Sequence, residues 1–257
     1  MNRALSIVNL VALVVTVVIN YLSNTVFFNG ATVGSISDQF ETLITPAPYA
    51  FGIWAVIYLG LAAFVISHLS TSVNSSAEVN RVGIWFLLSC LANCCWILAW
   101  VHGYIGWSVV IMLLLVFSLV KIIIRTDMEL TDPGPSTIVF LWWPFCLYFG
   151  WICIASLVNI AAWLVSIHWN GLGMNASFRA ISMIIVAAMI YLLLTWRRNM
   201  REAALVGVWA FIAIGVADRA YAPSVAIAAW IMAVIVFLSS MLHAYKNRKL
   251  GPFRRRT

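Results

Sequence analysis

Apolar segments follow one another along nearly the whole chain, with only short polar connections between them. This pattern constrains the fold most, because a helix needs about 20 apolar residues to cross a hydrocarbon core of about 30 Å. Of the 257 residues, 64% are hydrophobic and only 9% are charged, whereas soluble domains carry about 25% charged residues. The sequence therefore predicts an all-α fold, a polytopic membrane helical bundle.

The polar connections divide the chain into eight predicted transmembrane spans. These spans cover about residues 4–28, 47–68, 82–100, 105–124, 138–167, 180–196, 203–217 and 222–245. With eight spans and a cytoplasmic N-terminus, 13 of the 15 Lys and Arg residues fall on the cytoplasmic side. Because cytoplasmic loops carry an excess of basic residues, this asymmetry predicts that both termini are cytoplasmic.

The formal net charge of +7 is explained by a membrane flank and does not indicate a nucleic-acid partner. Six of the basic residues lie in the tail 246–257, directly after the last predicted span. Such a cluster is typical of the cytoplasmic side of a membrane protein. Together with the absence of a transit-like leader, it favours the bacterial cytoplasmic (inner) membrane.

Three predicted spans each carry aromatic, amide or small side chains along one helix face. The members are Trp54 and Tyr58 in the second span, Asn93 and Trp96 in the third, and Trp151, Ala155 and Asn159 in the fifth. An unpaired polar group in hydrocarbon costs roughly 2–7 kcal/mol, so these faces are expected to meet other helices or a cavity. They indicate either a small-molecule pocket or interhelical hydrogen bonds worth about 0.6–2 kcal/mol each.

Catalytic and metal-binding patterns are not evident in the sequence. The five cysteines fall inside predicted spans, at spacings that match no zinc or haem-attachment motif, and are interpreted as packing residues. The ionisable residues lie near span ends, and no nucleophile with a base or carboxylate pair is apparent. We therefore predict no catalytic residue, no metal site and no required cofactor, which favours a binding protein over an enzyme.

Three motifs in order resemble those of the TspO/MBR family, the tryptophan-rich sensory or translocator proteins. The second span reads Thr-Pro-Ala-Pro-Tyr-Ala-Phe-Gly-Ile-Trp-Ala-Val-Ile-Tyr over residues 45–58, the third carries Asn93 and Trp96 in an N-x-x-W pattern, and the fifth matches at Trp151, Ala155, Ser156 and Asn159. The resemblance covers roughly residues 1–165, the length of the five-helix members of the family.

The chain departs from the family pattern in several places. It reads Pro-Ala-Pro where the family has Pro-Pro, Pro144 comes early relative to Trp151, and three further spans follow the fifth. We therefore expect a TspO-like five-helix bundle over residues 1–165, three additional transmembrane helices over residues 166–245, and a basic cytoplasmic tail over residues 246–257.

The resemblance implies a pocket for a tetrapyrrole, such as porphyrin or haem, or another flat hydrophobic ligand. The residues expected to line it are Phe51, Trp54, Tyr58, Asn93, Trp96, Trp151, Ala155 and Asn159. The loop 29–46 is expected to act as its outer lid, and the bound ligand would serve transport or sensing. A transporter of another small solute or lipid and a porphyrin-modifying enzyme are the alternatives. Expected partners are the lipid bilayer and the hydrophobic ligand, and a homodimer remains open.

Overall fold

The computed structural model describes residues 3–69, 77–131 and 133–247, and every regular element in these ranges is helical. The long helices are α1 (Arg3–Leu22), α3 (Ile53–Leu69), α5 (Trp85–Val101), α6 (Ile105–Arg125), α8 (Trp143–Ser166), α9 (Ala176–Arg198), α10 (Arg201–Asp218) and α11 (Pro223–Lys246). Each overlaps one predicted span, which confirms the predicted helical bundle. Of the predicted basic tail 246–257, residues 248–257 lie outside the described residues.

Six of the described segments are long and apolar enough to cross a membrane. They are Ala4–Leu22, Pro48–Ser67, Ile105–Arg125, Pro135–Ser166, Ala176–Arg198 and Pro223–Lys246. The apolar helix α5 has only 17 residues, and α10 carries Arg201, Glu202 and Asp218 at its ends. Helices suit this setting because each satisfies its backbone hydrogen bonds internally, where no water is available to do so.

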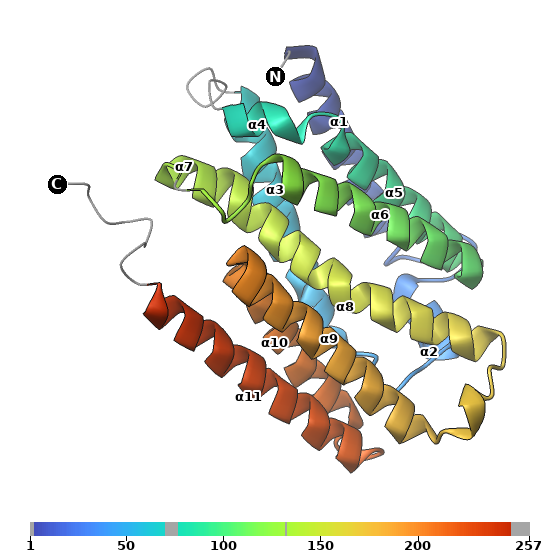
Figure 1. The fold of residues 1–257 in the computed structure, drawn as a ribbon. Coiled ribbons are helices and arrows are strands. Elements are labelled where there is room, and N and C mark those ends of the chain that lie inside the picture. Colours follow the sequence, from blue (N-terminus) through green and yellow to red (C-terminus); the bar gives the residue numbers. More distant parts are fainter. Residues whose placement is uncertain (1–2, 70–76, 132, 248–257) are drawn as a thin grey trace.

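Helix α8 runs through the middle of the molecule (Figure 1). Helices α1, α5 and α6 lie on one side of it, and α9, α10 and α11 lie on the other. The beginning of α1, the short helices α4 (Ala77–Val82) and α7 (Pro135–Thr137), and the C-terminal end of α11 gather at one end, called here the α4 end. The short helix α2 (Val33–Gln39) lies at the opposite end, called here the α2 end.

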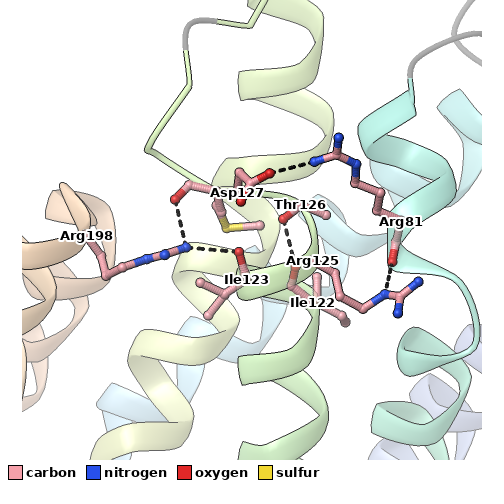
Figure 2. A network of polar contacts seen from close by, with 8 residues as sticks. Arg81, Ile122, Ile123, Arg125, Thr126, Asp127 and Arg198 are labelled. Atoms are coloured by element: carbon pink, nitrogen blue, oxygen red, sulfur yellow. Dashed lines mark hydrogen bonds and ion pairs between the residues drawn. The ribbon is translucent and has the colours of Figure 1, made fainter.

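Arginines from three helices hold the connection that follows α6 at the α4 end, as Figure 2 shows. Arg81 forms an ion pair with Asp127 at 2.6 Å, and Arg125 donates through Nε to the Arg81 carbonyl at 2.9 Å. Arg198 of α9 donates to the Ile123 carbonyl at 3.0 Å. Basic residues from separate predicted cytoplasmic segments therefore lie together at one end, while the orientation of that end in a membrane remains a prediction.

The first helix ends earlier than predicted, at Leu22 instead of residue 28. Ser23 and Thr25 donate side-chain hydrogen bonds to the carbonyls of Asn20 and Leu22, and Asn24 also donates to Asn20. Short polar side chains of this kind compete with helical backbone bonding and favour turns. The apolar residues after Leu22 therefore form turns that lead into the loop 29–46, called here the lid loop.

One buried hydrophobic cluster contains side chains from all eight long helices of the described chain. The three helices after Ser166 therefore share a core with the first five, although the predicted domain boundary itself stays a prediction. The contact between α8 and α10 is close, because a Cβ atom added at Gly150 would lie 2.7 Å from the Ala203 carbonyl oxygen. The Tyr191 hydroxyl of α9 donates to the Gly150 carbonyl at 2.8 Å.

Replacement of Gly150 by alanine is expected to destabilise the bundle by about 1–3 kcal/mol, because the added methyl group forces the α8 and α10 backbones apart. Thermal unfolding in detergent, followed by circular dichroism, measures the change. Gly52→Ala is the control, since a Cβ atom there meets nothing within 4 Å. Equal unfolding midpoints for the two variants would contradict the proposed close packing.

Candidate functional site

A cavity of about 150 Å³ lies among α1, α3, α5, α6 and α8, beneath the lid loop. Seven of the eight predicted ligand-binding residues line this space, which we call the Trp cavity: Phe51, Trp54, Asn93, Trp96, Trp151, Ala155 and Asn159. The eighth, Tyr58, stacks on Trp54 with ring centroids 5.3 Å apart and an interplanar angle of 21°. The structure thus brings the three predicted helix faces together, while their role in binding a ligand stays a prediction.

Aromatic rings from several helices form the walls of the Trp cavity. The Phe51 ring meets the Trp151 indole edge to face at 5.7 Å, and Trp96 stacks on Trp100 at 5.7 Å. Phe51 belongs to the short helix η1 (Pro48–Gly52), which directly precedes α3. Because such ring pairs are rigid and favour fixed offset or edge-to-face geometries, the cavity has a defined shape.

Asn159 connects three helices at the wall of the Trp cavity. Its side-chain oxygen accepts a hydrogen bond from the Trp96 indole of α5 at 2.8 Å, and its amide donates to the Ser108 hydroxyl of α6 at 2.8 Å. Asn159 is 2% exposed, so this amide is buried and paired. The interpretation as an interhelical hydrogen bond is therefore confirmed for Trp96 and Asn159, both of which also line the cavity.

Asn93 contributes a second polar group to the cavity wall. Its amide nitrogen donates to the Tyr148 hydroxyl at 3.2 Å, while its side-chain oxygen is buried and has no hydrogen-bond partner among the described residues. A buried acceptor without a donor costs about 1–3 kcal/mol. Asn93 therefore has an acceptor oxygen beside the cavity that pairs with no described residue. Tyr148, which the sequence analysis did not single out, also meets Trp54 edge to face at 5.9 Å.

The lid loop covers the cavity and is attached to the bundle by specific contacts. Its residues Val33, Ser37 and Pro46 line the Trp cavity. The Trp100 indole of α5 donates to the Val33 carbonyl at 3.1 Å, and the Val33 amide donates to the Ser23 carbonyl at 3.1 Å. Trp100 was missed by the sequence analysis, although its spacing of four from Trp96 places both indoles on one helix face.

Helix α10 supports the same site from the side of the three additional helices. The Trp209 indole donates to the Ala50 carbonyl of η1 at 3.2 Å and meets the Tyr49 ring edge to face at 5.3 Å. The Ala47 amide donates to the Ala213 carbonyl of α10 at 3.1 Å. Helix α10 therefore fixes the segment that carries Phe51, a support that no local sequence pattern revealed.

A second polar cluster lies at the α4 end and was not foreseen. Ligand atoms of Glu129, Cys146 and Glu202 all lie within 4.8 Å of one another, a composition that could hold a metal ion. Asn199 donates to the Glu129 carboxyl oxygen at 3.3 Å. Burial, and then the nearby Glu202 carboxylate, raises the pKa of Glu129 to about 8, while Arg201 acts in the opposite direction. The three members come from separate elements, so their approach depends on tertiary packing.

A model of the family described as TSPO-like protein matches residues 6–242 of the chain. This range includes the helices that carry the three motifs and the three additional helices. The chain belongs to the TSPO-like family. No curated protein and no solved structure matches the chain. Family membership therefore extends over both parts of the predicted domain division.

Within this TSPO-like bundle, Asn159→Ala is expected to lower the free energy of unfolding by about 1–3 kcal/mol. The change removes two interhelical hydrogen bonds and leaves the Trp96 indole unpaired. Ser156→Ala is the matched control, because the Ser156 hydroxyl donates only to the Ile152 carbonyl of its own helix. Thermal unfolding in detergent distinguishes the two, and an equally small effect for both would contradict the role of Asn159.

The raised pKa of Glu129 predicts a pH dependence of stability. The folded state binds this proton more tightly than the unfolded chain, where the carboxyl titrates near 4.5. The stabilisation is therefore fully present below about pH 4.5 and is lost as the pH rises through about 8. Glu129→Gln is expected to remove this loss. Parallel stability profiles for the variant and the wild type, measured by thermal unfolding from about pH 5 to 8, would contradict the prediction.

Proposed function

We propose that the chain is an integral membrane protein that binds a flat hydrophobic ligand, such as a tetrapyrrole, in the Trp cavity. The observation that carries this proposal is the convergence of Phe51, Trp54, Trp96 and Trp151 on one partly enclosed space. Ligand pockets are typically apolar, with a few polar groups that fix the orientation of the ligand. The aromatic walls suit a planar ring system, which is the ligand class that the resemblance implies.

Polar groups at the cavity match the periphery of such a ligand. The indole N–H groups of Trp54 and Trp151 have no hydrogen-bond acceptor among the described residues and remain available as donors. The unpartnered side-chain oxygen of Asn93 is an acceptor. A flat molecule with polar substituents at its edge would stack on the rings and pair with these groups.

The volume of the cavity indicates how such a ligand would enter. Its 150 Å³ is below the range of about 300–1,000 Å³ that is usual for small-molecule sites. A tetrapyrrole therefore requires the cavity to widen. We expect the lid loop to move when the cavity widens. Its residues Val33, Ser37 and Pro46 form part of the cavity wall, and loops move more easily than packed helices. Binding coupled to lid movement would serve sensing or transport in a bacterial cytoplasmic membrane.

Titration of the purified protein with protoporphyrin IX tests this proposal. Saturable quenching of tryptophan fluorescence and a shift of the Soret band are expected for the wild type. Trp54→Phe and Trp151→Phe each remove an indole N–H and part of the stacking surface, so each is expected to weaken binding about 5- to 30-fold, equivalent to about 1–2 kcal/mol.

Trp107→Phe is the matched control, because Trp107 is 68% exposed and does not line the cavity. Binding that is indifferent to Trp54 and Trp151, or equally sensitive to Trp107, would place the ligand elsewhere. A lack of saturable binding by the folded wild type would refute the tetrapyrrole assignment. Formation of a new chromophore in light or in darkness would instead favour a porphyrin-modifying enzyme.

A further inference from the structure

A second, larger cavity of about 710 Å³ lies at the α2 end, between α8 and α9. We call it the α8–α9 groove. Residues 41–44 of the lid loop form one wall, and Ala161, Leu164 and Val165 of α8 face Ala180 of α9 across the space. Its volume lies within the range of about 300–1,000 Å³ that is usual for ligand sites. The groove shares no lining residue with the Trp cavity, so the two sites are distinct.

Two opposite charges line the α8–α9 groove without neutralising each other. Arg179 of α9 and Glu41 of the lid loop both face the cavity, and they form no ion pair with one another in the described chain. The Arg179 guanidinium lies 5.9 Å from the Trp169 ring centroid. Its Nη1 donates to the Trp169 carbonyl at 3.4 Å. The described residues accept no other hydrogen bond from this guanidinium, so its remaining N–H groups can bind an anion.

The beginning of α9 adds a second feature that favours an anion next to Arg179. Ala176, the first residue of α9, also lines the groove. The Asn175 side chain caps this helix by accepting a hydrogen bond from the Phe178 amide at 2.7 Å. The remaining backbone N–H groups of the first turn and the positive end of the helix dipole attract negative charge. Phosphate would therefore be bound more strongly on the α9 side of the groove than near Glu41.

The groove combines this charged rim with an apolar wall that reaches the outer surface of the bundle. Val165 is 43% exposed and Met174 is 36% exposed, although both are apolar and line the groove. An indole such as Trp169 suits the boundary between headgroups and hydrocarbon, since it has an apolar body and one polar N–H. The site is thus amphipathic in the same sense as a membrane lipid.

We propose that the α8–α9 groove binds a phospholipid whose headgroup carries both a phosphate and a primary ammonium. The phosphate lies at Arg179 and the first turn of α9, the ammonium pairs with Glu41, and an acyl chain follows the apolar wall beside Leu164. Charge complementarity selects this headgroup, because a purely anionic lipid would leave Glu41 unpaired. The proposal does not depend on the ligand of the Trp cavity.

Native mass spectrometry of the delipidated full chain in detergent tests the proposal. The probes are phosphatidylethanolamine and phosphatidylglycerol with identical acyl chains. We expect the wild type to bind phosphatidylethanolamine at least about tenfold more tightly than phosphatidylglycerol. Arg179→Gln is expected to weaken phosphatidylethanolamine binding about tenfold or more, the usual effect of losing a charged hydrogen bond. Glu41→Gln is expected to abolish the preference between the two lipids.

Arg219→Gln is the matched control, since Arg219 is an exposed arginine outside the groove, and it should bind both lipids like the wild type. Arg179→Lys keeps the charge and should restore part of the affinity that Arg179→Gln loses. Equal affinity of the wild type for the two lipids overturns the proposal, as does an equal effect of Arg179→Gln and Arg219→Gln. If Arg179→Gln fails to fold, Glu41→Gln decides the outcome, because Glu41 makes no hydrogen bond in the described chain.

Discussion

The pairing of Asn159 with two neighbouring helices is the interaction on which the rest of the site depends. A buried amide in an apolar bundle stabilises only the arrangement that satisfies both its oxygen and its nitrogen. Here that arrangement places the Trp96 indole on one side and the Ser108 hydroxyl on the other. These two hydrogen bonds hold α5, α6 and α8 in one rotational orientation about their own axes. The rotation of α5 and α8 in turn directs Asn93 and Trp151 toward the same cavity.

Helix α8 extends this constraint to the three additional helices. Because Gly150 has no side chain, the backbone of α10 at Ala203 approaches α8 more closely than a larger residue would allow. The Trp209 hydrogen bond to the Ala50 carbonyl then fixes η1, and with it Phe51. The helices that follow the five-helix part therefore shape the Trp cavity, although none of their described side chains lines it.

The sequence predicts the eight helical segments because a hydrocarbon environment requires long apolar helices. It also predicts most of the residues that line the cavity, because helical spacing places Trp151, Ala155 and Asn159 on one face. It does not predict the early end of α1, which depends on side chains such as Thr25 that bond back to the backbone. Contacts between distant segments were also missed. From the sequence, Trp209 is one more mid-span indole. Glu129 and Glu202 are far apart in the sequence, and only the packing of α10 against the connection between α6 and α7 brings them together in space.

Three packed aromatic rings bear on the route by which a ligand proposed for the Trp cavity would enter and leave the bundle. Phe64, Phe86 and Phe145, from α3, α5 and α8, are fully buried near the α4 end. Their ring centroids lie 4.9–5.9 Å apart in edge-to-face contacts. A ligand that passed through the bundle would have to separate three packed rings, whereas one that entered past the lid loop would displace only a surface segment. In this conformation a path past the lid loop at the α2 end separates fewer packed side chains than a path between these rings toward the α4 end.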